Sequence, residues 1–131
     1  MRCVVIGDKP LTDQTLQQLK DTLADISHIY FELEFLIGGS ENFIAAAADI
    51  CSELCGDNYY QNYRIVTDTG ESGPHRVVLP DVYMIKPEYL DHWRDRVLFS
   101  KAEYAVICTS SRTPAMSEWV NSHSAKFHTI I

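Results

Sequence analysis

Residues 30–56 read YFELEFLIGGSENFIAAAADICSELCG, and this stretch decides the fold that the sequence predicts. Its first eight residues are aromatic or branched except for Glu32 and Glu34, which alternate with apolar positions. This pattern indicates a strand over 30–37. Gly38-Gly39 ends that strand, and the alanine-rich segment after Ser40 has high helix propensity and closes with a glycine. A strand, a glycine turn and a helix therefore follow one another directly.

The same alternation continues on both sides of this unit. Further strands are expected over 2–6, 63–67, 104–109 and 127–131, and further helices over 11–26, over 87–100 and from 113 through 120. Brief apolar runs occupy 77–79 and 82–85, and the turn-rich stretch 68–76 predicts a mobile surface loop. The fold class expected is therefore α/β, a Rossmann-like three-layer sandwich with a mostly parallel sheet and helices on both faces.

Length and composition predict one globular domain over residues 1–131. Apolar residues make up 46% of the chain and charged residues 22%, which suits a packed core. A net charge of −7 argues against broad nucleic-acid binding. The N-terminal apolar run is too short for a signal peptide or a membrane span, so we expect a cytoplasmic protein.

Four cysteines lack the dense spacing of a disulfide framework, so reduced thiols are expected. Cys51 and Cys55 lie one helical turn apart, a spacing that can ligate a metal, but no second pair completes a site. We therefore expect small buried apolar side chains there, with no metal and no cofactor.

Ligands of parallel α/β sheets gather beyond the carboxyl ends of the strands. Three loops should meet there, and they contribute Gly7, Asp8 and Lys9, then Gly38, Gly39 and Ser40, and finally Ser110, Ser111, Arg112 and Thr113. The glycine pair lets the backbone approach a ligand, and the helix N–H groups after Ser40 favour an anion such as phosphate. The same residues also suit any tight strand-to-helix turn.

The loop Ser110–Thr113 joins two hydroxyls, a guanidinium and a helix start, a mixture suited to a phosphate or a carboxylate. The alternative is a helix cap beside a solvated Arg112. Glu118 lies one helical turn beyond Pro114 and is the candidate hydrogen-bond acceptor or general base, although most exposed helical glutamates only solvate a surface. No P-loop, GxSxG or HExxH pattern announces an enzyme.

Three blocks, MRCVVIGDK, LIGGSENFIAAAADICSELCG and HWRDRVLFSKAEYAVICTSSRTPAMSEWVNSHSAKFHTII, resemble the SLOG superfamily of Rossmann-like domains. Arg94 falls where that family has an arginine before its penultimate strand. Ser111-Arg112-Thr113 resembles the family's Ser-Arg-Gly-Thr loop, and Glu118 lies near its acidic residue. Pro114 replaces the loop glycine, and the family's Pro-Gly-Gly-x-Gly-Thr-x-x-Glu pattern is absent.

The resemblance implies a pocket for a nucleotide or a nucleotide-derived signal, with Arg94 among its ligand-binding residues, and a homo-oligomer paired through helices. The leading hypothesis is a module that senses or sequesters such a ligand. One alternative is a phosphoribohydrolase in which Glu118 assists attack while Ser40 and Arg112 hold the 5′-phosphate. Another is a non-catalytic interaction domain whose acidic surface meets a basic partner.

Overall fold

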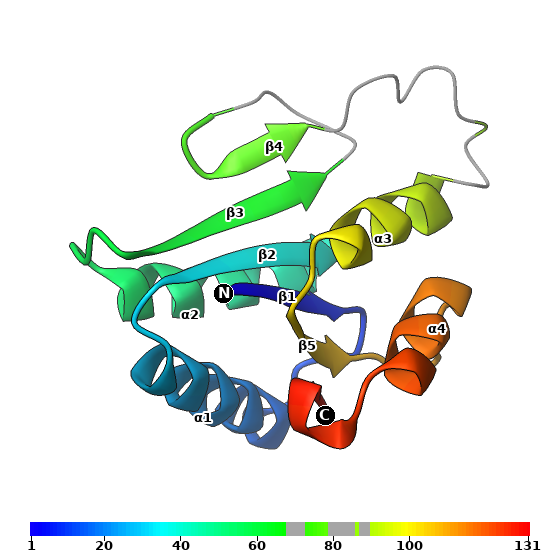
Figure 1. Ribbon diagram of the computed structural model, residues 1–131, viewed down its shortest axis with the longest axis horizontal. Helices are drawn as coiled ribbons and strands as arrows, with labels where there is room; N and C mark the ends of the chain where they lie inside the picture. The colour runs from blue at the N-terminus through cyan, green and yellow to red at the C-terminus, as the bar shows by residue number, and fades with distance from the viewer. Residues whose placement is uncertain (68–72, 79–85, 87–89) are drawn as a thin grey trace.

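The computed structural model describes residues 1–67, 73–78, 86 and 90–131 (Figure 1). Within these residues the elements run β1 (Arg2–Gly7), α1 (Asp13–Ile29), β2 (Leu33–Gly39), α2 (Glu41–Cys55), β3 (Gln61–Thr67), β4 (Arg76–Val78), α3 (Leu90–Ser100), β5 (Tyr104–Cys108), α4 (Pro114–Ser122), a 3-10 turn (Ala125–Phe127) and β6 (His128–Ile130). The expected apolar run 82–85 lies outside the described residues, as do parts of the expected loop 68–76 and of the helix over 87–100.

The described strands form one sheet of order β4-β3-β2-β1-β5-β6, and every neighbouring pair is parallel. The predicted α/β class with a Rossmann-like parallel sheet is confirmed. The chain builds outward from β1 through β2, β3 and β4, and then returns to place β5 on the other side of β1. The order reverses between β1 and β5, so the loops that follow these two strands diverge there and leave room for a ligand.

Helices cover both faces of the sheet, which makes three layers (Figure 1). On one face, α1 and α2 pack on alternate residues of the strands, among them Cys3, Val5, Phe35 and Ile37. On the other face, α3 and α4 pack on the intervening residues, such as Val4, Ile6, Leu36 and Ile107. The central strands are therefore buried on both sides, as the nearly continuous apolar sequence of 104–109 predicts.

Side-chain caps begin three of the helices. The hydroxyls of Thr12, Ser40 and Thr113 accept from the backbone N–H three residues further on, in α1, α2 and α4 respectively. The backbone of Gly56, at φ +48°, ends α2 as expected. Ser40 directly follows β2, and Thr113 follows β5 after a short loop, so both helices start at the carboxyl edge of the sheet.

Several element boundaries differ from the prediction. Helix α1 continues to Ile29 because the Tyr30 N–H still bonds to the Ile26 carbonyl, at 3.1 Å. Strand β2 consequently begins at Leu33 rather than at Tyr30, and Phe31 is 69% exposed. At the other end, the expected strand over 127–131 is shortened to His128–Ile130 by the 3-10 turn that precedes it.

All four cysteines are buried and none forms a disulfide. Burial raises the pKa of Cys3 and Cys51 far above the ordinary thiol value, so both are protonated at neutral pH. The expectation of small buried apolar side chains is confirmed. Separately, within the described part of the chain no helix combines the length and apolar composition needed to cross a membrane.

Candidate functional site

The carboxyl ends of β1 and β2 pack against each other with no room for a side chain between them. Gly39 has φ +125°, and a Cβ there would overlap the carbonyl oxygen of Gly7. The Ser40 N–H donates to that same oxygen at 3.0 Å. The second glycine of the pair is therefore required by the fold itself, because only glycine combines this backbone angle with this close approach.

Gly38, the first glycine of the pair, lies inside β2 and has a different neighbour. A Cβ on Gly38 would stand 2.5 Å from Leu98 Cδ1 of α3. The missing side chain thus lets α3 pack closely on the sheet. This close packing brings Arg94, one turn earlier on α3, to the end of β2.

Arg94 reaches over the end of β2 and is largely buried there. Its Nη1 donates to the Gly39 carbonyl at 3.5 Å, and its Nη2 lies 3.4 Å from Asp95 Oδ1. The side chains of Arg94 and Asp95 are 13% and 1% exposed. Removing two charges from water costs free energy even when they pair. Burial of the Arg94–Asp95 ion pair at the edge of the sheet therefore carries a desolvation cost.

Asp8 ties the loop after β1 to the loop after β5. Its Oδ1 accepts from the Thr109 hydroxyl at 2.6 Å and from the Ser110 N–H at 3.4 Å. The backbone N–H groups of Asp8 and Lys9 both donate to the Cys108 carbonyl, at 3.1 and 3.3 Å. The two loops that flank the switch point are therefore held together by hydrogen bonds.

A cavity of about 210 Å³ opens where these parts meet. Six of the residues expected to bind a ligand line it, namely Gly7, Asp8, Gly39, Ser40, Arg94 and Thr113. Asp95 and Met116 also line it. The starts of α2 and α4 both border the cavity, so it combines two helix N-termini, one guanidinium and two carboxylates.

Five of the expected ligand-binding residues are not among the described residues that line this cavity. They are Lys9, Gly38, Ser110, Ser111 and Arg112. Ser110, Ser111 and Arg112 are exposed, and their loop adjoins the cavity without lining it, because the Ser110 N–H donates to Asp8 and the loop leads into Thr113. These three residues are called the rim. Lys9 is half-buried near the end of β5.

The Cys108 thiol lies at the end of β5, close to the same loops. Burial raises its pKa, Asp8 adds to that increase, and the positive charge of Lys9 opposes it. Since the net shift is upward, the thiol stays protonated at neutral pH. Cys108 is thus a packing residue and not an activated nucleophile.

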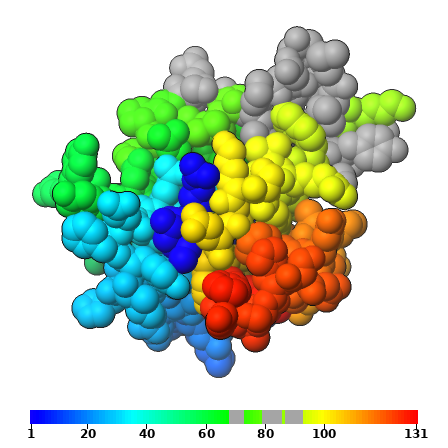
Figure 2. Space-filling model, viewed as in Figure 1, coloured from blue at the N-terminus to red at the C-terminus, as the bar shows by residue number. Residues whose placement is uncertain are grey.

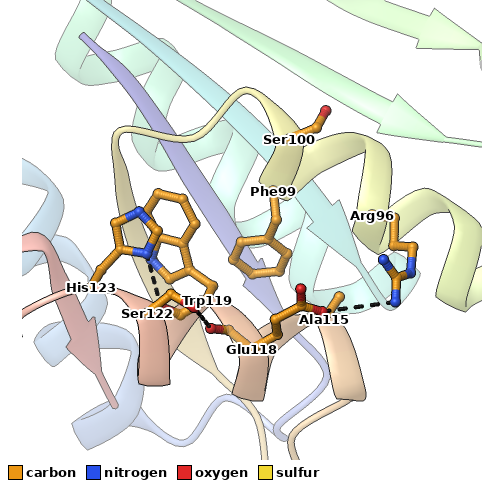
Figure 3. Close-up of a pocket in the computed structure, with 8 residues that line it drawn as sticks. All are labelled: Arg96, Phe99, Ser100, Ala115, Glu118, Trp119, Ser122 and His123. Atoms are coloured by element: carbon orange, nitrogen blue, oxygen red, sulfur yellow. Dashed lines mark hydrogen bonds and ion pairs between the residues drawn. The ribbon is translucent and has the colours of Figure 1, made fainter.

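Glu118, the expected acid or base, lies away from this cavity. Its side chain is 68% exposed and pairs with Arg96 at 3.8 Å. Both residues line a separate pocket of about 320 Å³ between α3 and α4, beside the stacked rings of Trp119 and His123 (Figure 3). The structure therefore does not bring Glu118 together with the residues at the switch point.

Asp95 is the charged residue at this site that the sequence interpretation missed. It precedes Leu98 and Phe99 by three and four residues, so the three share one face of α3. Because both of those residues are buried, helical spacing alone was a signal that Asp95 would be buried too.

The chain was compared with protein-family models, with curated proteins and with solved structures, and none of these comparisons gave a match.

Proposed function

We propose that this protein binds a nucleotide-like, phosphate-bearing small molecule at the switch point, as a sensor or a sequestering module. The observation that carries the proposal is the cavity where Arg94, two helix starts and Asp8 meet. Helix N-termini and guanidinium groups favour anions, and a carboxylate such as that of Asp8 accepts hydrogen bonds from sugar hydroxyls. The cavity thus offers complementary groups for both parts of a nucleotide.

The size of the cavity limits how much of a ligand it encloses. At about 210 Å³ it is smaller than the roughly 300–1,000 Å³ typical of sites that enclose a whole small molecule. A phosphate group fits inside such a volume, whereas a nucleoside would extend over the rim formed by Ser110, Ser111 and Arg112. In this arrangement Arg112 approaches the phosphate from outside while Arg94 contacts it from within.

The proposal is tested by titrating the protein with inorganic phosphate, nucleoside monophosphates and cyclic dinucleotides, using calorimetry and thermal unfolding. A ligand at 100 times its dissociation constant should add roughly 2.7 kcal/mol to the free energy of unfolding. Arg112→Ala should weaken binding by roughly 1.5–3 kcal/mol, and Arg112→Lys should recover only part of this loss.

Arg96→Ala is the matched control, because it removes the same charge from an exposed side chain that lines the other pocket. Arg94 is less suitable for substitution, since its loss would leave the buried Asp95 carboxylate without this ion pair. Absence of binding by every phosphate compound would refute the proposal. Equal affinities for wild type and Arg112→Ala would remove Arg112 from the site.

The resemblance to the SLOG superfamily extends the proposal to a homo-oligomer, and the unpaired cysteines extend it to a location in the cytoplasm. Light scattering coupled to gel filtration measures the oligomeric state directly.

A further inference from the structure

A second and larger cavity lies between α3 and the sheet, separate from the switch-point cavity. It measures about 480 Å³, within the range of small-molecule sites. Strands β2, β3 and β4 supply one wall with Leu36, Val66 and Val77. Helix α3 supplies the other wall with Trp93 and Val97. Most of this lining is apolar, so the cavity suits an apolar molecular body.

The charged lining residues gather toward one end of this cavity. Arg2 and Glu34 face each other in register at the starts of β1 and β2. Lys101 directly follows α3, which runs back toward these strand starts after beginning near their far ends (Figure 1). In Figure 2 the N-terminal residues lie between the segment of β2 and the end of α3, and the segments of β3 and β4 lie beyond β2. The cavity is therefore charged toward the amino edge of the sheet and apolar toward Trp93.

The lining of the charged end holds more cations than carboxylates, although the whole chain carries −7 and the Glu103 carboxylate, outside the lining, accepts from the Arg2 backbone N–H at 3.2 Å. Arg2, Arg64 and Lys101 line it against one carboxylate, that of Glu34. Arg64 Nε pairs with Glu34 Oε2 at 3.4 Å, which satisfies both charges. Of the described residues, no carboxylate lies within ion-pair distance of the Arg2 guanidinium or the Lys101 ammonium. Two cations thus remain available to a ligand at the rim of an apolar cavity.

We infer that this cavity binds a small amphipathic carboxylate. The apolar body packs against Trp93, Val66 and Val77, and the carboxylate meets Lys101 and Arg2. An aromatic body would stack on Trp93, and an aliphatic body would fill the same space by dispersion contacts. The inference does not depend on the proposed nucleotide site, because Trp93 and Val97 line this cavity while Arg94 and Asp95 line the other.

The test uses two probes, 3-phenylpropanoate for an aromatic acid and octanoate for an aliphatic one. The matching alcohols, 3-phenylpropan-1-ol and octan-1-ol, keep the body and remove the charge, and acetate keeps the head alone. The chain has two tryptophans, so nitrogen-15 NMR of the wild-type protein shows two indole signals, which a Trp119→Phe variant assigns. Binding in this cavity should shift the Trp93 signal and leave that of Trp119 in place.

At least one carboxylate should bind about tenfold more tightly than its alcohol, and acetate should not shift Trp93. Lys101→Met should weaken carboxylate binding by about tenfold and alter alcohol binding less than twofold. Lys20→Met, which replaces an exposed side chain of α1, changes the net charge equally and should have no effect.

Four results would overturn the inference. The first two are failure of both acids to bind and a shift of the Trp119 signal in place of the Trp93 signal. The other two are equal affinities for the acids and their alcohols, and equal weakening by Lys20→Met and Lys101→Met. Because Lys101 is exposed, its substitution should leave the unfolding temperature unchanged, which separates a lost contact from a lost fold.

Discussion

Substitution of Gly39 by alanine should destabilise this protein far more than the same change at its other described turn glycines. The backbone angle, φ +125°, strains any residue with a Cβ by about 1–3 kcal/mol. The new methyl group would also overlap the Gly7 carbonyl, and overpacking typically adds about 1–3 kcal/mol. We therefore expect a loss of about 2–6 kcal/mol, a large fraction of the stability of a typical domain.

Two other glycines separate these contributions. Gly56 also has a positive φ, +48°, but its Cβ would come no closer than 3.8 Å to the Glu53 carbonyl, so Gly56→Ala should cost only the strain, about 1–3 kcal/mol. Gly73 has no positive φ, and no described atom lies within 4 Å of its Cβ position, so Gly73→Ala should change stability by less than about 1 kcal/mol. Urea unfolding followed by circular dichroism measures all three variants. A loss at Gly39 no greater than that at Gly73 would refute the reasoning.

Three more predictions concern protonation, capping and an exposed ion pair. Burial raises the pKa of Cys3 and Cys51, whereas thiols of the unfolded chain have a pKa of about 8.5. The free energy of unfolding should therefore be insensitive to these groups below pH 8 and fall by about 3 kcal/mol at pH 9.5, as the unfolded chain loses protons first. Urea titrations at both pH values check this, and Cys51→Ala should lessen the fall by about 1.4 kcal/mol, which is the contribution of that one thiol. Thr113→Ala should cost about 1 kcal/mol through loss of the α4 cap while Thr113→Ser stays near wild type, and a larger cost for serine would contradict the capping role. Glu118→Ala should change thermal stability by less than about 0.5 kcal/mol, since its ion pair is exposed, and a larger effect would reveal a contact beyond Arg96.

The sequence predicted the fold well because its signals are local and strong. The cap at Ser40, the alanine-rich helix and the closing Gly56 each act within a few residues, so α2 was located almost to the residue. The start of β2 was misplaced for a physical reason. The alternation in YFELEFLI suits a strand, but Tyr30 still bonds back to α1, and that helix carries the chain past Ile29 before β2 begins.

The candidate site was predicted in outline but not in its details. Ligands of parallel α/β sheets bind beyond the carboxyl ends of the strands, and this rule predicted that the loops of Asp8, Ser40 and Thr113 meet. All three residues line one cavity. The reason for the glycine pair is tertiary, since it depends on Gly7 and Leu98, which are distant in the chain. Local patterning does not report such contacts, and the same holds for the second cavity, whose walls come from four strands and α3.

The central position of β1 has a consequence for how the chain acquires its structure. β1 pairs on one side with β2, which follows within about thirty residues, and on the other with β5, about a hundred residues later. During synthesis β1 can pair with β2 while its other edge stays unpaired, because β5 has not yet been made. An unpaired inner strand is a template for association with other chains. Until β5 emerges from the ribosome, the free edge of β1 therefore leaves the chain prone to association with other chains.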